Sequence, residues 1–206
     1  MYRAGAHRGF SAIVAGAKRF CSDRRGVAAI EFAFIVPVLL ILYFITMEAS
    51  QAIETSKKVS RIGSMVADLV TQQTTVKKAD LDAIMKIGTS TLQPYNRSAP
   101  SIIITGIQIT DETTPKVQVA WSRKLVGTTY SADAATGSTT TVPSTLNIRG
   151  TFLVRVESDL AYKPIIAWSA DNSKTLGLTS AFNNISMGET YYLRPRRGPT
   201  VPCSDC

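Results

Sequence analysis

The chain has 206 residues, of which 45% are hydrophobic and 18% are charged. This length suits one domain of roughly 100–150 residues with a core of its own, plus a smaller segment, and it excludes two large domains. The three cysteines exclude a disulfide-dense small scaffold, and the single histidine, His7, excludes most histidine-based chemistry.

Positive charge is concentrated at the N-terminus. Residues 1–26 contain six Lys and Arg residues and one acidic residue, Asp23, so they contribute +5 of the formal net charge of +8. The rest of the chain is nearly neutral. A basic tail of this kind attracts anionic lipid or nucleic acid. A hydrophobic run begins directly after the tail, so anionic lipid of a membrane is favoured over nucleic acid as its partner.

That run, Val27–Met47, has 21 residues with one charged residue, Glu31, and one proline, Pro37. As an α-helix it would extend about 31 Å, which is the thickness of the hydrocarbon core of a bilayer. No polar face interrupts it, so we predict a single membrane-spanning helix. Basic residues are more frequent before the run than after it, so the positive-inside rule places the N-terminus in the cytoplasm and residues 48–206 outside.

Two targeting signals are alternatives to this helix. A cleaved secretory signal has an apolar region of about 7–15 residues, shorter than this run, although a small-x-small site exists at Ser50-Gln51-Ala52. The first 20 residues are also similar to an Arg-rich transit peptide, with no acidic residue before Asp23. The length of the run favours a helix that stays in the membrane.

Glu31 is unusual because an Asp carboxylate at the centre of a membrane helix costs about 2.5–3.5 kcal/mol on insertion scales. It lies one turn in from the cytoplasmic end, where the cost is lower. The side chain can be protonated or extend to the interface, or a cation at the same depth can neutralise it. Cleavage between Gly26 and Val27 would create such a cation, because the new α-amino group of Val27 would be available to the Glu31 of a neighbouring subunit.

The order of these features is basic residues, Gly26, four residues, Glu31, an aromatic residue and a long apolar helix. It resembles the class III signal of type IV pilins and pseudopilins. More narrowly, Arg24–Phe44 resembles the TadE-like proteins of tight-adherence (Flp) pilus systems. The resemblance extends over about residues 19–55, and Phe32 stands where that family usually has tyrosine.

The resemblance implies a processing site and an assembly site. Prepilin peptidase would cut between Gly26 and Val27, and Glu31 with Phe32 would contact other subunits. The implied partners are that peptidase, other pilin or pseudopilin subunits and subunits of the secretion platform. The implied location is the inner membrane, crossed once, with the C-terminal head in the periplasm or outside the cell.

The remaining chain predicts an α+β, pilin-like fold. Residues 1–26 form a basic cytoplasmic leader or tail, residues 27–47 the membrane helix, and residues 48–206 an extracytoplasmic head. Apolar residues at helical spacing extend the first helix to about Gln72. Lys78–Leu92 predicts a second helix, with Ala79-Asp80 as an N-cap candidate.

The apolar period then changes to two, which predicts an antiparallel sheet of three or four strands packed on the outer helix. The expected strands are Ser101–Thr110, Lys116–Lys124, Thr151–Tyr162 and Thr190–Arg194. The first two form a hairpin and the last is an edge strand. Gly127–Asn147, rich in Ser, Thr, Ala and Gly, predicts an exposed loop.

The cysteines fall into two groups. Cys21 lies in the basic tail and would be removed with a leader, whereas Cys203 and Cys206 form a CxxC pair in the head. A zinc half-site would need a second pair, and a thioredoxin-like site would need a helix N-terminus. We favour a small disulfide in an oxidising periplasm, with pairing to another chain as an alternative.

No catalytic set emerges from the sequence, which has no GxSxG, phosphate-loop or HExxH motif. Asp68, Asp80 and Asp82 are interpreted as surface acids and caps, and Tyr191-Tyr192 as an edge strand rather than a nucleic-acid surface. We therefore expect no enzyme activity, cofactor, metal or nucleic-acid partner. Two functions remain: a minor pilin or pseudopilin, and an uncleaved single-pass assembly factor or binding module.

Overall fold

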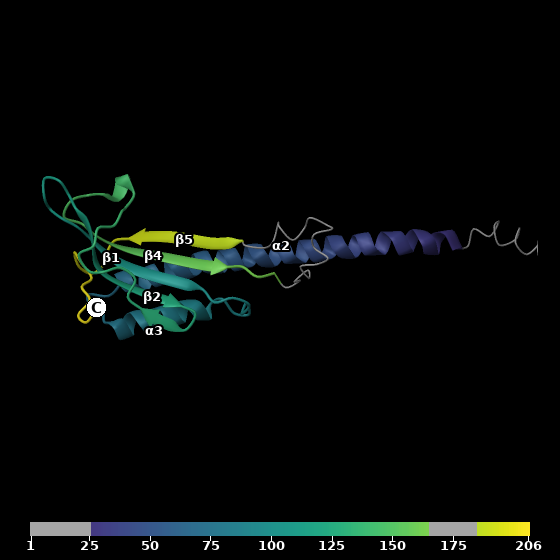
Figure 1. Ribbon diagram of the computed structural model, residues 1–206, viewed down its shortest axis with the longest axis horizontal. Helices are drawn as coiled ribbons and strands as arrows, with labels where there is room; N and C mark the ends of the chain where they lie inside the picture. The colour runs from purple at the N-terminus through teal and green to yellow at the C-terminus, as the bar shows by residue number, and fades with distance from the viewer. Residues whose placement is uncertain (1–25, 165–184) are drawn as a thin grey trace, which may run out of the picture. The chain divides into compact units, whose positions relative to one another are not determined.

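The computed structural model describes residues 26–164 and 185–206 (Figure 1). The other residues of the basic leader, including Cys21, lie outside this part of the chain. In chain order the elements are α2 (Val27–Thr71), α3 (Lys78–Ser90), β1 (Ser101–Ile109), β2 (Val117–Val126), β3 (Thr129–Ser131), the short 3-10 helix η2 (Ser144–Leu146), β4 (Phe152–Ala161) and β5 (Ser186–Leu193). A long apolar helix, a second helix and an antiparallel sheet confirm the predicted α+β class.

The chain divides into two compact units, residues 1–47 and 48–206. Helix α2 is continuous through both and contains Pro37. Up to Met47 its sequence is apolar on every side, whereas from Glu48 onward buried residues recur every three or four positions. A stripe of this kind marks a helix that packs on a core along one face. The prediction that the helix continues to about Gln72 is confirmed, since it ends at Thr71.

Helix α3 begins after Lys77, which is its N-cap. The predicted cap at Ala79-Asp80 is wrong by one turn, because Asp80 acts from inside the helix. Its carboxylate oxygen Oδ2 accepts a hydrogen bond from the backbone N–H of Lys77 at 3.0 Å, which satisfies a donor that the helix itself leaves open. Leu81, Ile84 and Met85 form the buried side of α3.

The sheet has five antiparallel strands in the order β3-β2-β1-β4-β5 (Figure 1). The predicted hairpin of β1 and β2 is confirmed. The additional strand is β3, which pairs with the last three residues of β2. Gly127, with a φ of 63°, makes the tight turn between them. The expected loop Gly127–Asn147 therefore begins with a short strand and also contains η2, although most of it is exposed.

Strand β5 is an edge strand, as predicted, and it is longer than the predicted Thr190–Arg194. It starts at Ser186, because Ser186–Gly188 continue the ladder with the end of β4. Ser186 and Gly188 have no strong strand preference of their own, whereas Met187 between them is buried in the main core. These residues are part of the strand because they pair with β4, and not because of their own sequence.

The main core lies between one face of the sheet and the helices of the head. Ile102, Ile104 and Trp121 from the sheet belong to the same buried cluster as Ile62 and Leu81 from α2 and α3. A smaller cluster of Ile107, Ile109 and Leu153 lies apart from it and is packed by partly buried residues, Val117, Val142, Leu146 and Tyr192. The long β2–β4 connection thus supplies part of this second cluster.

The position of Ile104 predicts a large loss of stability on truncation. Its side chain is fully buried on the central strand, so Ile104→Ala should lower the free energy of unfolding by about 2–5 kcal/mol. The matched control is Ile87→Ala on α3, where the isoleucine is 54% exposed and the change should stay within about 0.5 kcal/mol. Urea unfolding of the detergent-solubilised chain measures both, and equal losses would contradict the assigned core.

Candidate functional site

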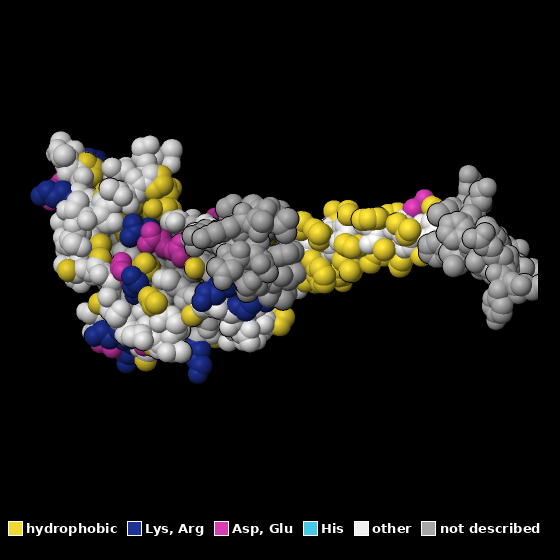
Figure 2. Space-filling view, turned by 45° about the vertical axis from the view of Figure 1, so that its right-hand side comes forward, with side chains coloured by type: hydrophobic (Ala, Val, Ile, Leu, Met, Phe, Trp, Pro, Cys, Tyr) yellow, Lys and Arg dark blue, Asp and Glu magenta, His cyan; other side chains and the backbone are white. Residues whose placement is uncertain are grey.

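The first half of α2, Val27–Met47, leaves large apolar side chains uncovered. Figure 2 shows hydrophobic side chains on the visible side of this segment. Phe34 is 75% exposed and Phe32 is 68% exposed. Covering each side chain of this size is favourable by about 1.5–3 kcal/mol. The helix is long and apolar enough to cross a membrane, and it is compatible with single-pass anchoring.

Glu31 lies within this uncovered surface, one turn after the first residue of α2. It is exposed, and among the residues that the structure describes it has no hydrogen-bond or ion-pair partner. Side chains of a helix lean toward its N-terminus, so the carboxylate is directed toward the turn that Val27 begins. Of the four residues predicted for processing and assembly, Val27, Glu31 and Phe32 therefore lie in the first two turns of α2, and Gly26 directly precedes it.

Gly26 directly precedes α2, and its surroundings do not require glycine. Among the described residues, apart from its neighbours in the chain and the backbone of the helix, no heavy atom lies within 4 Å of the position that a Cβ would take there. Gly63, by contrast, has a Tyr191 ring carbon 2.8 Å from its Cβ position. Packing thus explains the glycine inside the head and leaves the glycine at the start of α2 without a structural reason.

Comparison with protein families identifies the same part of the chain. Residues 26–61 match the family model of TadE-like proteins. The resemblance inferred from the sequence is therefore confirmed for this segment. The TadE-like segment contains the uncovered apolar surface with Glu31, and it ends in the part of α2 that packs on the sheet. No curated protein and no solved structure matches the chain significantly.

Besides Glu31, the TadE-like segment contains the exposed Glu54 and the buried Glu48, which is 4% exposed in the head. The phenol of Tyr162 donates a hydrogen bond to its Oε1 at 2.5 Å. Tyr162 stacks on Tyr95 with ring centroids 5.6 Å apart, and the guanidinium of Arg97 lies 4.6 Å from the Tyr95 centroid. This group of side chains fastens α2 to the end of β4.

The environment of Tyr162 strongly disfavours its ionised form. Burial raises the pKa of its phenol most, and the hydrogen bond and charge of Glu48 raise it further. Both effects have the same physical basis, since a phenolate here would lose its hydration and face a carboxylate. The phenol therefore stays a hydrogen-bond donor to Glu48 throughout the neutral range.

Sequence reasoning missed Glu48 because an acidic residue after a membrane helix suggests only a flanking charge. A usable signal was present. Glu48, Ala52, Thr55, Val59 and Ile62 follow one another at spacings of four and three residues, which is one face of a helix. A carboxylate in phase with a buried stripe requires a donor from the facing element, and Tyr162 is that donor.

The other acidic candidates have structural partners, in agreement with their interpretation as surface acids and caps. Arg123 donates two hydrogen bonds to Asp82, each 2.8 Å long. Arg196 lies 2.6 Å from Asp68. The hydroxyl of Tyr191 lies 2.5 Å from Oγ of Ser60 on α2, so this tyrosine serves the attachment of β5.

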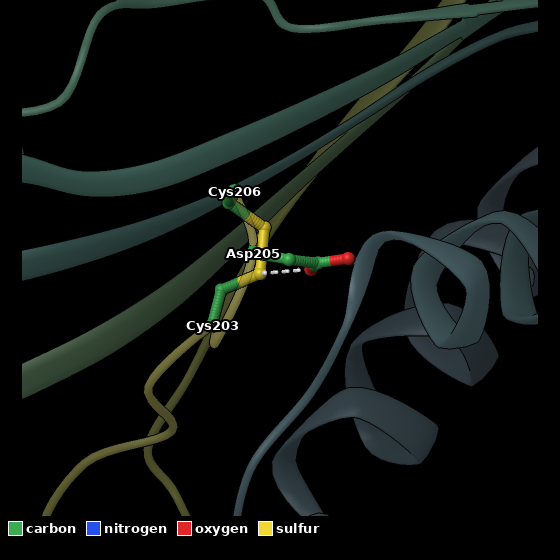
Figure 3. A group of neighbouring side chains, drawn as sticks. All are labelled: Cys203, Asp205 and Cys206. Atoms are coloured by element: carbon green, nitrogen blue, oxygen red, sulfur yellow. Dashed lines mark hydrogen bonds between the residues drawn. A yellow bond between two sulfur atoms is a disulfide. The ribbon is translucent and has the colours of Figure 1, made fainter.

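Cys203 and Cys206 are joined by a disulfide, with Asp205 beside it (Figure 3). The dashed line in Figure 3 joins Sγ of Cys203 to Oδ1 of Asp205, 3.6 Å apart. A disulfide sulfur carries no proton, so this is a close contact without a donor. The two sulfur atoms and a carboxylate oxygen of Asp205 lie within 4.8 Å of one another, close enough to be considered as ligands of one metal ion. Because metals bind the thiolate form of cysteine, the oxidised pair does not suit a metal.

The buried pair of Glu48 and Tyr162 leads to a stability prediction. Tyr162→Phe should lower the free energy of unfolding by about 1.5–3 kcal/mol, because a hydrogen bond to a charged group is lost. The control is Tyr191→Phe, which removes a hydroxyl–hydroxyl contact and should cost about 0.5–1.5 kcal/mol. Urea unfolding at neutral pH ranks the two variants, and the reverse order would contradict the role of Glu48.

The same pair has a defined pH dependence. The folded-state pKa of Tyr162 lies above its ordinary value of 10.0, so above that value the folded protein holds this proton longer than the unfolded chain does. The stability advantage over Tyr162→Phe is therefore complete below about pH 10 and decreases as the pH rises further. Unfolding of both proteins at pH 7 and at pH 11 measures this decrease.

Proposed function

We propose that the chain is a TadE-like minor pilin or pseudopilin that takes part in the assembly of a Flp-type (tight-adherence) pilus at the inner membrane. One observation carries this proposal. An uncovered apolar helix bears a single carboxylate, Glu31, one turn from a Gly26–Val27 junction, within the segment that matches TadE-like proteins. The match supports an association with a Tad pilus, and the position of Glu31 one turn from Val27 supports the pairing between subunits that we propose.

In the proposed mechanism prepilin peptidase cuts after Gly26. No described side chain packs where a Cβ of residue 26 would lie, which supports the proposal that peptidase recognition, rather than packing, requires glycine at this position. The new amine of Val27 stands at the N-terminus of α2, where the helix dipole adds positive potential. Amine and dipole together attract a carboxylate.

Glu31 of a neighbouring subunit supplies that carboxylate. Four residues of helix separate the two groups along each chain, so pairing sets an axial offset of about 6 Å between neighbouring helices. In hydrocarbon, removing one partner of such a pair leaves an uncompensated charge and costs about 3–5 kcal/mol. Apolar helix surfaces can pack against each other at many axial offsets. The pair of charges would therefore favour one of these offsets between neighbouring helices.

This role requires contacts between helices and no catalytic group, so we propose that the protein is not an enzyme. It crosses the inner membrane once, with the N-terminus in the cytoplasm and residues 48–206 outside. Other pilin, pseudopilin and secretion-platform subunits cover the apolar surface, and the head makes lateral or terminal contacts in the filament.

The alternative is an uncleaved, single-pass assembly factor or binding module. It is favoured by the extent of the family match, which ends at residue 61 and leaves most of the head unmatched. In that case residues 1–26 stay as a basic tail, and Glu31 pairs with the helix of a different protein.

The N-terminus of the mature protein separates the two functions. We expect intact mass and N-terminal sequencing of membrane-extracted protein from its own host to give a chain that starts at Val27. A chain that starts at Met1 would support the uncleaved factor. A chain that starts near Ile53 would overturn both functions, because the apolar run would then be a removed secretory signal.

Substitution of the carboxylate tests the assembly step. Glu31→Gln keeps the side-chain size and removes the charge, so it should lower the yield of surface filaments at least about tenfold while Val27 remains the mature N-terminus. The matched control is Glu54→Gln, an exposed acid of the same helix that pairs with Lys58 at 3.0 Å. Normal filament yield from Glu31→Gln would contradict the proposed pairing.

A further inference from the structure

The C-terminal strap, residues 194–206, fastens elements that lie far from it in the sequence. At the end of α2 the backbone N–H of Arg196 donates a hydrogen bond to the carbonyl oxygen of Thr71 at 2.9 Å. This satisfies one of the carbonyl groups that a helix leaves open at its last turn. Further along, Val201 is fully buried in the main core, and Nε1 of Trp121 donates to its carbonyl oxygen at 2.7 Å.

The end of the strap pairs with the connection between α2 and α3. The backbone N–H of Val76 donates to the carbonyl oxygen of Pro202, and the N–H of Ser204 donates to the carbonyl oxygen of Val76, each at 3.0 Å. The hydroxyl of Thr75 also donates to Pro202, at 3.2 Å. The strap thus adds a short parallel bridge directly before α3.

Asp205 completes the attachment. Its Oδ1 accepts a hydrogen bond from the backbone N–H of Lys78, the first residue of α3, at 2.8 Å. A carboxylate at this position also interacts favourably with the helix dipole. Cys203 and Cys206 enclose Asp205 in a four-residue loop closed by the disulfide (Figure 3). The disulfide therefore restricts the backbone that holds this cap in place.

The disulfide is accessible to another protein. Cys206 is exposed and Cys203 is half-buried. Beside Cys203 lies a hollow of about 290 Å³, lined by Gln108, Ala120, Trp121, Phe152, Thr200 and Pro202. An incoming thiol can approach Cys206 from solvent, and the hollow at Cys203, with both polar and apolar lining residues, offers space for a side chain of the partner.

We propose that the Cys203–Cys206 pair is a reversible thiol–disulfide exchange site, and that its oxidation state decides whether the end of the strap stays docked on α3. The partner is a protein that carries its own redox-active cysteine pair. This inference concerns the strap alone and does not depend on the pilus function.

The exchange balances in two steps. In the oxidising direction, a thiolate of this chain attacks the partner's disulfide, and a mixed disulfide forms as one partner thiolate leaves. The second thiolate of this chain then attacks the mixed disulfide. The Cys203–Cys206 bond forms, the partner leaves as a dithiol, and two protons and two electrons pass from this chain to the partner. Reduction by a partner dithiol runs through the same steps in reverse.

Docking and oxidation are coupled by thermodynamic linkage. If the closed loop favours docking of Asp205 on α3, docking must favour the disulfide by the same factor. Weakening the strap at a distant contact should therefore make the disulfide easier to reduce.

The first test uses the full chain in detergent with Cys21→Ser, so that only the pair titrates. Hydrogen exchange is compared before and after reduction with dithiothreitol. We expect reduction to speed exchange of the Val76, Lys78 and Ser204 amides at least tenfold, with no change on the central strand at Ile104. Equal protection of the three amides in both states would overturn the proposal.

The second test measures the coupling itself. In glutathione buffers, Trp121→Phe removes the hydrogen bond to Val201 without changing any charge near Cys203, and it should shift the equilibrium toward the dithiol roughly two- to tenfold. Tyr191→Phe, which removes a hydroxyl contact outside the strap, should leave it unchanged. Alkylation followed by mass measurement counts the free thiols.

A milder variant keeps the second test decisive if Trp121→Phe fails to fold. Thr75→Ala removes only the exposed hydroxyl that donates to Pro202, and it should shift the equilibrium in the same direction by a smaller factor. Redox equilibria of Trp121→Phe and Thr75→Ala that both equal that of the parent would overturn the coupling.

Discussion

The constraint on which the other parts depend is that one helix, α2, has two different surroundings. A helix satisfies its own backbone hydrogen bonds, so Val27–Met47 can leave an apolar surface uncovered without any neighbour from its own chain. From Glu48 onward the same helix supplies Val59, Ile62 and Val66 to the core of the head. The sheet has no other long helix in the described chain to cover that core, so the head is built around the second half of α2.

The parts of the fold that local pattern specifies were predictable, and the parts that depend on distant partners were not. The alternation in Ser101–Ile109 and Val117–Val126 predicts their hairpin, because neighbouring strands alone determine it. The first residues of β5 depend on β4, and Asp205, which accepts a hydrogen bond at the start of α3, is equally remote in sequence. The spacing of apolar residues within one segment gives no information about a contact with a segment that is distant in the sequence.

Two of the three carboxylates of the TadE-like segment, Glu31 and Glu48, show the same difference at the candidate site. Glu31 was predictable because it interrupts an apolar run, and an interruption is visible in the sequence itself. Glu48 was missed because its meaning depends on Tyr162, 114 positions away. Both carboxylates need a hydrogen-bond donor or a cation, and they obtain it in different ways. The head supplies a donor to Glu48 from its own chain, whereas no described residue does so for Glu31, and the proposed assembly supplies that partner from outside.

Charge and cysteine placement are consistent with a single orientation in the membrane. By the positive-inside rule, the excess of Lys and Arg before Val27 favours the proposed orientation, with the N-terminal side in the cytoplasm. The chain has one cysteine on that side, Cys21, and a closely spaced pair on the other, with none between them. A reducing cytoplasm leaves a single thiol free, and an oxidising exterior favours a paired one. The proposed exchange at Cys203 and Cys206 needs this oxidising exterior, so it depends on the same orientation that we propose from the basic tail.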